Sequence, residues 1–242
     1  MQPWIQLGTA ASGPVLIIVD HASSFVPPEI ELGIDPGLLA THIAVDLGVA
    51  ALTASLRDRL QCAAILGAVS RLVVDLNRDP GDPAVIPVES DGQPIPGNRI
   101  DEGQRRARIE AWWLPYHEQV AKLITACEPQ LIVSLHSFTP QLAARPGSLR
   151  PWDIGILYNR DDRAARVAIP LLEAAGACVG DQLPYAGTVL NATMNRHAEA
   201  RGIAYLGVEV RQDRIAECVG VERWADILAP VIMSCTRTLS SR

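Results

Sequence analysis

Short apolar runs alternate along the chain with longer segments of helical periodicity. Several of the short runs are continuous rather than alternating, which is typical of strands that helices cover on both faces. The predicted strands are 15–20, 62–67, 71–76, 131–136, 154–158 and 203–210, and the predicted helices are 36–59, 102–127, 162–175, 193–201 and 220–239. This order predicts an α/β fold with a mostly parallel mixed sheet between two helical layers, and we expect residues 1–242 to form one domain.

Two long segments lack this periodicity. Residues 79–101 and 137–153 are rich in proline and glycine, which favour turns. Long loops in compact domains are often lids or binding loops, and disorder is the alternative.

Composition narrows the possible partners and compartment. The net charge of −6 disfavours a nucleic-acid or anionic-membrane partner, because both reward a basic surface. The apolar runs are shorter than the roughly 20 residues that a membrane helix needs. None of the five cysteines forms a C-x-x-C pair, and no basic segment followed by an apolar run resembles a signal peptide. We therefore expect a cytoplasmic protein with reduced cysteines.

Polar residues gather where the predicted strands end. In open α/β sheets, ligands bind outside the carboxyl ends of the strands. The residues that these ends supply are His21, Asp75, Asn77, Arg78, His136, Glu209 and Arg211, with Arg71 at the start of its strand. We expect many of them to face a common site.

Two histidines and a carboxylate are the usual protein ligands of a catalytic zinc ion, which leaves one position open for water. A further carboxylate then acts as the general base, and Glu209 has the right type and place. Other interpretations stay open. Either histidine could equally well make a structural hydrogen bond instead of binding a metal. Glu209 could equally well form an ion pair with Arg211.

Six motifs together resemble the N-formylglutamate amidohydrolase family. They extend from about residue 15 to residue 215, and Asp-Leu-Asn-Arg is the most specific of them. The motifs are His21 with Ser23 and Val26-Pro27-Pro28-Glu29; His42 with Asp46; Ser70 to Arg78; Leu135-His136-Ser137-Phe138; Pro184-Tyr185-Ala186-Gly187; and Val208-Glu209-Val210-Arg211.

The family is similar in turn to the zinc-dependent exopeptidases and aspartoacylases, and this implies a fold of that kind. It also implies roles: a zinc ion on His21 and His136, Glu209 as the base, and Asn77 with Arg78 on a substrate carboxylate. A planar guanidinium suits that last task, because it binds a carboxylate in bidentate fashion.

The third metal ligand departs from the pattern of those relatives. They place a carboxylate three residues after the first histidine, where this chain has Ser24. Glu29 is the first replacement we consider, because Pro27-Pro28 would stiffen a turn back toward His21. Asp46 is the second, on the helix predicted over 36–59, with His42 one turn away.

These observations predict a zinc-dependent amidohydrolase that acts on a small N-acylated amino acid, with N-formyl-L-glutamate as the first candidate. Arg71 is expected to stabilise the oxyanion, and Arg211 to bind the side-chain carboxylate or orient Glu209. One alternative is a zinc-dependent peptidase or amidase with another small substrate. A non-catalytic metal- or anion-binding protein is another. The same ligands suit iron, cobalt or manganese.

Overall fold

The computed structural model describes residues 1–9 and 13–240 and contains a seven-stranded sheet. Its strand order is β1-β3-β2-β6-β9-β7-β8. The strands are β1 (Trp4–Leu7), β2 (Val15–Val19), β3 (Ala63–Gly67), β6 (Leu131–Phe138), β7 (Ile154–Leu157), β8 (Val179–Asp181) and β9 (Ala204–Arg211). The four central strands β3, β2, β6 and β9 are parallel, whereas β1 and β7 pair antiparallel with their neighbours. The predicted mostly parallel mixed sheet is therefore confirmed.

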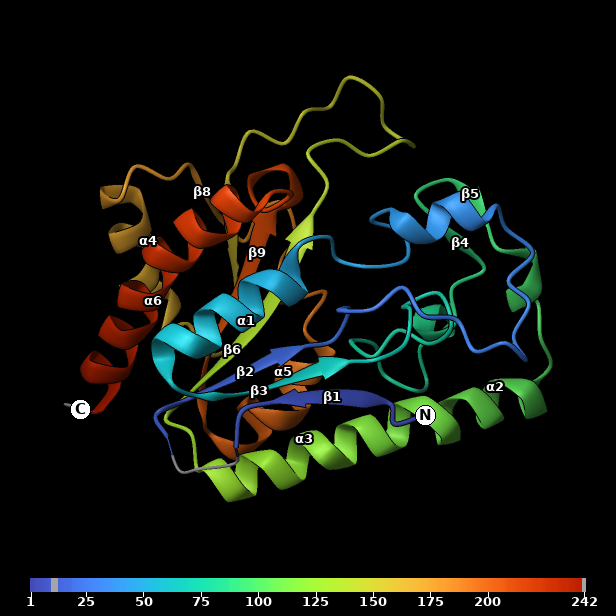
Figure 1. Ribbon diagram of the computed structural model, residues 1–242, viewed down its shortest axis with the longest axis horizontal. Helices are drawn as coiled ribbons and strands as arrows, with labels where there is room; N and C mark the ends of the chain where they lie inside the picture. Colours follow the sequence, from blue (N-terminus) through green and yellow to red (C-terminus); the bar gives the residue numbers. More distant parts are fainter. Residues whose placement is uncertain (10–12, 241–242) are drawn as a thin grey trace.

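Helices cover both faces of this sheet (Figure 1). The α-helices are α1 (Val49–Leu60), α2 (Glu102–Arg108), α3 (Leu114–Cys127), α4 (Ala165–Ala174), α5 (Ala192–His197) and α6 (Cys218–Ser240). A π-helical turn, Ile109–Trp113, joins α2 to α3. Short 3₁₀ turns are η1 (Pro36–Ala40), η2 (Pro83–Val85), η3 (Pro96–Asn98), η5 (Glu199–Arg201) and η6 (Gln212–Arg214), and β4 (Glu89–Ser90) with β5 (Gln93–Pro94) forms a small hairpin.

The central strands bury both of their faces, which explains their continuous apolar sequence. Along β2, Leu16 and Ile18 pack on the side of α3 and α5, whereas Ile17 and Val19 pack on the side of α1, α4 and α6. All four side chains are fully buried. This three-layer arrangement leaves the carboxyl ends of β2, β6 and β9 at one edge of the sheet.

The predicted strand 71–76 is wrong. Both sides of β3 are already paired, with β1 and β2, so a strand that follows it has no neighbour there. The segment instead folds into turns, in which the amide of Val73 donates to the carbonyl of Ser70 at 2.9 Å. Its apolar side chains are buried against α3 and the 79–101 segment, so their apolar character reflects tertiary packing.

The predicted helix 36–59 is also wrong in its middle. It divides into η1 and α1, and residues 41–48 form turns between them. Gly48 precedes α1 with a φ of +83°, and a Cβ atom there would lie 2.5 Å from the carbonyl oxygen of Ile215. Only glycine adopts this turn without strain, and the helix cannot extend back through it. The short strands β1 and β8 were not predicted.

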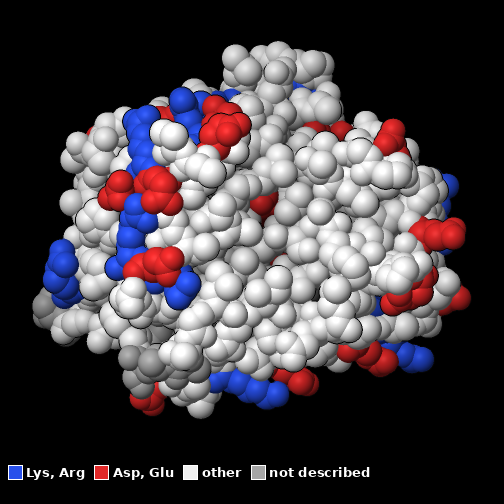
Figure 2. Space-filling model, viewed as in Figure 1, with Lys and Arg blue, Asp and Glu red and all other residues white. Residues whose placement is uncertain are grey.

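The surface carries interspersed charges rather than one basic region on the face drawn in Figure 2. Acidic and basic side chains alternate over α1 and α6, where Arg59 pairs with Glu222 and Asp226. Among the described residues, no helix is long and apolar enough to cross a membrane.

Candidate functional site

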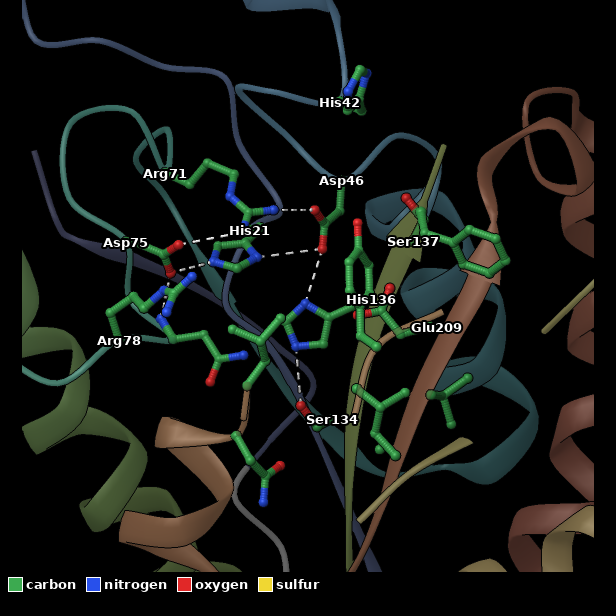
Figure 3. A pocket seen from close by; sticks show the side chains of 18 of the residues that line it. His21, His42, Asp46, Arg71, Asp75, Arg78, Ser134, His136, Ser137 and Glu209 are labelled. Carbon is green, nitrogen blue, oxygen red and sulfur yellow. Dashed lines mark hydrogen bonds and ion pairs between the residues drawn. The ribbon is translucent and has the colours of Figure 1, made fainter. Parts of the chain in front are cut away.

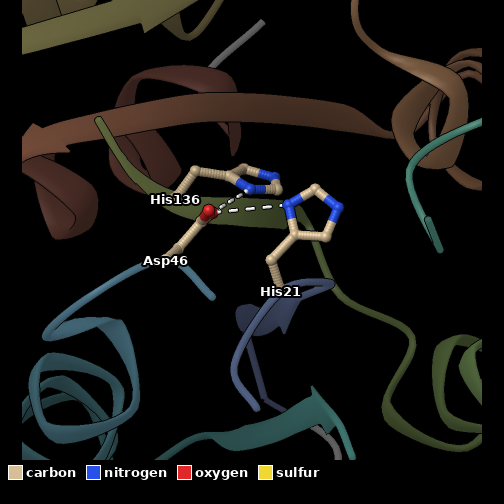
Figure 4. A group of neighbouring side chains, drawn as sticks. All are labelled: His21, Asp46 and His136. Atoms are coloured by element: carbon tan, nitrogen blue, oxygen red, sulfur yellow. Dashed lines mark hydrogen bonds and ion pairs between the residues drawn. The ribbon is translucent and has the colours of Figure 1, made fainter. Parts of the chain in front are cut away.

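His21, Asp46 and His136 converge at the carboxyl edge of the sheet (Figure 4). His21 follows β2, His136 lies on the neighbouring strand β6, and Asp46 lies in the turns before α1. One donor atom from each lies within 4.8 Å of the others, and all three residues are buried. Asp46 Oδ2 is 2.9 Å from His136 Nδ1 and 3.4 Å from His21 Nδ1. The chain thus joins two imidazoles and a carboxylate around a common point.

The outer nitrogen of each imidazole has an oxygen partner. His21 Nε2 lies 2.7 Å from Asp75 Oδ1, and His136 Nε2 lies 3.2 Å from Ser134 Oγ. An ionised carboxylate only accepts, so His21 donates from Nε2 to Asp75, and its Nδ1 atom is directed toward Asp46. This Nδ1 atom is buried and has no hydrogen-bond partner among the described residues. A carboxylate behind a histidine is the usual support of a metal ligand.

The charges of the cluster shift its pKa values. Burial and Arg71 oppose protonation of His21, but Asp75 and Asp46 outweigh them and raise its pKa to about 9. Burial opposes ionisation of Asp46, yet His21 and His136 hold its pKa well below its ordinary value. The site therefore places an ionised carboxylate where a cation is favoured.

Glu209 lies beside this cluster (Figure 3). It sits on β9 directly opposite His136 on β6, so the strand register sets their separation. The residue is buried, its Oε2 atom has no hydrogen-bond partner among the described residues, and burial raises its pKa to about 7. A carboxylate with this pKa is suited to exchange protons near neutral pH.

These groups line a cavity of about 230 Å³. Arg71, Asn77 and Arg78 also line it. Figure 3 shows Arg71 and Arg78 on the opposite side of His136 from Ser137. Arg71 donates to Asp46 at 3.1 Å and to Asp75 at 3.3 Å, so its guanidinium links the two carboxylates.

Two predicted site residues lie elsewhere. Glu29 is exposed and borders a different surface hollow, because the turn that closes from Pro27 to Ile30 directs it away from His21. The expectation that Glu29 would complete the cluster is therefore wrong, and Asp46 takes that place. Arg211 does not line the cavity: it pairs with Asp213 at 2.7 Å and donates to the carbonyls of residues 150–152.

Sequence reasoning missed several supporting residues. Asp75 was noted only as a strand-end carboxylate, and Ser134 looked like an ordinary strand residue. Tyr185 lines the cavity, and its only signal was the Pro-Tyr-Ala-Gly motif. Outside the cavity, His197 of the predicted helix 193–201 is buried, with His117 at 2.8 Å.

Ligands of open α/β sheets bind at the carboxyl ends of the strands, where this chain gathers a His-Asp-His group and a buried glutamate. The sequence profile of one family, N-formylglutamate amidohydrolase, matches residues 13–216. The chain belongs to this family. The resemblance to this family that the sequence motifs indicated is therefore confirmed.

Two solved structures resemble the chain over almost its whole length. A gene product of Agrobacterium tumefaciens is 31% identical, with a TM-score of 0.92, and the match covers 99% of this chain and 97% of that one. The N-formylglutamate amidohydrolase of Ralstonia eutropha is 16% identical, with a TM-score of 0.75, over 100% and 99% of the two chains. The second likeness supports the fold. A search of curated protein sequences finds no match.

Proposed function

We propose that the chain is a metal-dependent amidohydrolase that cleaves N-acyl amino acids, with N-formyl-L-glutamate as the first substrate to test. The main support for this proposal is that His21, Asp46 and His136 converge beside the buried carboxylate of Glu209. Membership of the family supports the same activity. In this proposal residues 1–242 act as one catalytic domain.

The donor atoms fit a divalent transition metal. His21 Nδ1 and His136 Nδ1 both face the Asp46 carboxylate, and one donor atom from each of the three residues lies within 4.8 Å of the others, so they could share one ion. Two imidazoles and one carboxylate form a frequent zinc ligand set, and iron, cobalt and manganese accept it too. A bound ion would lower the pKa of water and polarise the substrate carbonyl.

Glu209 is proposed as the general base and acid. Its uncommitted Oε2 atom and its raised pKa suit it to take a proton from the attacking water. The hydroxide equivalent adds to the acyl carbon, the C–N bond breaks, and Glu209 returns the proton to the leaving nitrogen. The products are the free carboxylic acid and the amino acid, so atoms and charges balance.

The arginines are proposed to hold the substrate. Arg78 is paired with Asp82 at 3.3 Å, but its side chain is 31% exposed, so it keeps N–H groups for the α-carboxylate beside Asn77. Arg71 keeps one N–H on each terminal nitrogen after it donates to Asp46 and Asp75. These remaining donors would stabilise the oxyanion that develops on the acyl oxygen.

The metal content of purified protein tests the centre. We expect the wild-type protein to hold about one equivalent of zinc after dialysis against a buffer that contains zinc. His136→Ala should lose this equivalent, whereas His42→Ala should keep it, because His42 lines the cavity but pairs with Asp91 instead of the cluster. A folded wild-type protein that binds no divalent metal would contradict the proposal.

Turnover tests the reaction. N-formyl-L-glutamate, other N-formyl amino acids, N-acetyl amino acids and dipeptides should be compared by the release of free amine. Hydrolysis of the N-acyl amino acids supports the proposed class. Cleavage of dipeptides alone favours the peptidase alternative, and one bound zinc ion without any turnover favours a binding protein.

A further inference from the structure

Asn191 is a buried polar residue of the cavity that the proposed mechanism leaves unused. It lines the cavity directly before α5, and only 6% of the residue is exposed. Its Nδ2 atom donates to the Tyr205 hydroxyl oxygen at 2.8 Å and to Asn195 Oδ1 at 2.9 Å, so both N–H bonds are used. Its Oδ1 atom accepts no hydrogen bond from the described residues, and protein atoms do not enclose it. This oxygen therefore faces the cavity as an unused acceptor.

The hydrogen bonds of Tyr205 fix which end of the Asn191 amide faces the cavity. The Tyr205 hydroxyl lies 3.0 Å from Glu199 Oε1, a carboxylate oxygen that accepts its only proton. Burial raises the pKa of Tyr205, so this proton stays on the hydroxyl. The hydroxyl oxygen also accepts from the backbone amide of Asn159 at 2.7 Å. Toward Asn191 it can therefore only accept, which places the NH₂ group there and the amide oxygen in the cavity.

The position of Asn191 before a helix would normally occupy its oxygen. An asparagine at this position usually accepts from a backbone amide in the first turn of the helix. Asn191 makes no such bond, because the amide of Thr193 donates instead to Asn77 Oδ1 at 3.0 Å. The same bond holds the start of α5 against Asn77, which is proposed to bind the α-carboxylate. Asn191 therefore lies on the amino-acid side of the site.

The cavity extends below the level of the reaction, between β6 and β9. His136 and Glu209 are register partners on these strands. Ser134 and Gly207 are the partners two residues nearer the amino ends of the strands, and both line the cavity. Two residues of a parallel strand span about 6.6 Å. Figure 3 shows Ser134 on the side of His136 away from Asp46.

Asn191 lies at the lower end of this part of the cavity. Tyr205, which holds Asn191, lies two residues below Gly207 on the same face of β9. Leu157, the register partner of Gly207 on β7, and Leu190 line the cavity here too. None of these residues carries a charge. A group that enters this part of the cavity meets apolar side chains and the Asn191 oxygen.

We propose that this part of the cavity receives the side chain of the substrate amino acid, and that Asn191 selects a neutral side chain ending in an N–H donor, such as the carboxamide of glutamine. With the α-carboxylate on Asn77 and Arg78 and the acyl carbon beside Glu209, the side chain is the substrate group that remains to fill it. A side-chain carboxylate has no proton to donate, and burying it against the Asn191 oxygen is unfavourable. Arg211, which the sequence suggested for such a carboxylate, lies outside the cavity. The inference rests on the proposed hydrolysis and specifies its substrate class.

The N-formyl derivatives of L-glutamine, L-glutamate and L-methionine form the test set, because their side chains are similar in length and differ in charge and donor groups. We expect the wild type to have the highest kcat/KM for the glutamine compound and a value about 10-fold lower or less for the glutamate compound. Asn191→Leu removes the acceptor and nearly keeps the shape. It should lower kcat/KM for the glutamine compound by about 3- to 10-fold and change that for the methionine compound by less than about threefold.

Two further variants separate the acceptor from the structure around it. Asn195→Ala is the matched control, because Asn195 is exposed, accepts from Asn191 and does not line the cavity. It should leave the ratios among the three substrates unchanged, since Tyr205 still fixes the Asn191 amide. Asn191→Asp serves if the leucine variant does not fold. It should lower the ratio of the glutamate to the glutamine value by about another 10-fold, because two negative charges would meet.

Two results would overturn the inference while the proposed hydrolysis stands. One is a wild type that prefers N-formyl-L-glutamate. The other is an Asn191→Leu variant that lowers kcat/KM for all three compounds by one factor, as expected if the oxygen meets a group that they share, such as the scissile N–H.

Binding separates this inference from the proposed function. Calorimetric titration of the three compounds into zinc-loaded Glu209→Gln protein, alone and with Asn191→Leu, gives the same ratios without turnover. If the wild type hydrolyses no N-acyl amino acid, the proposed function fails, and these binding ratios still decide for or against Asn191. Equal affinities for the three compounds, or no binding of any of them, would contradict the inference.

Discussion

Asp75 connects three parts of the site through one carboxylate. Its Oδ1 atom accepts from His21 Nε2 at 2.7 Å and from the amide of Asn77 at 2.9 Å, and its Oδ2 atom accepts from Arg71 at 3.3 Å. Burial opposes its ionisation, but His21 and Arg71 hold its pKa well below the usual range. Asp75 therefore stays ionised and fixes which nitrogen of His21 faces the cluster.

Replacing Asp75 with asparagine should weaken metal binding while every proposed ligand remains. An amide lacks the negative charge that makes His21 a stronger ligand, and supports of this kind contribute about 10- to 100-fold in affinity. We expect Asp75→Asn to raise the zinc dissociation constant by that factor, measured by competition with a chelator. Asp82→Asn is the control, because Asp82 pairs with Arg78 and lies outside the contacts of His21. Equal zinc affinities in the two variants would argue against this role.

At the residue scale, the sequence revealed the groups that strand ends supply. His21, His136 and Glu209 follow or end apolar runs, so the geometry of a parallel sheet predicted that they would meet. Asp46 could not be chosen over Glu29 in this way, because it comes from an irregular turn. Only tertiary contacts, such as the bond from the Asp46 amide to the His21 carbonyl at 2.9 Å, bring it to the histidines.

The turn segment 41–48 is the element that delivers Asp46. It ends at Gly48, whose positive φ and close approach to the Ile215 carbonyl leave no room for a side chain. The sequence suggested one continuous helix here, because helical periodicity on both sides conceals a turn that depends on a distant contact. Element boundaries set by such contacts are not visible in local sequence, and the buried run 71–76 was mistaken for a strand for the same reason.

Gly48→Ala should therefore destabilise the fold by about 1 to 3 kcal/mol, because it adds strain at a positive φ and a clash at 2.5 Å. Urea denaturation gives the free energy of unfolding. Gly81→Ala is the matched control: a Cβ atom at Gly81 meets nothing within 4 Å, and we expect a change below about 0.5 kcal/mol. Equal effects at the two glycines would show that the turn tolerates a side chain.

Acid stability is a property of the whole molecule, and a buried pair of histidines, His117 and His197, should contribute to it. Leu76 O can only accept, so His117 donates to it from Nε2 at 2.9 Å and accepts at Nδ1 from His197. This arrangement requires His117 to be neutral, and protonation of His197 is disfavoured because its Nδ1 atom is buried and has no hydrogen-bond partner among the described residues. Burial and its neighbour His197 lower the pKa of His117 to about 3, and burial and Arg201 lower that of His197 to about 4.

Both native pKa values lie below the ordinary histidine value of about 6.5, so the unfolded chain binds more protons than the native one between pH 6.5 and pH 4. The stabilising effect of the neutral pair is complete above pH 6.5 and decreases as the pH falls, by about 1.4 kcal/mol per pH unit for each ring. We expect the wild type to lose about 2 to 4 kcal/mol from this pair between pH 6.5 and pH 5. Urea denaturation at several pH values gives the free energy of unfolding as a function of pH. For the double variant His117→Gln with His197→Gln, we expect this free energy to fall less steeply with decreasing pH than for the wild type, whatever its absolute stability. Above pH 7 the two proteins should show the same dependence on pH. The other titrating groups occur in both proteins and cancel in this comparison, so equal slopes between pH 5 and pH 6.5 would mean that the two rings accept protons inside the fold.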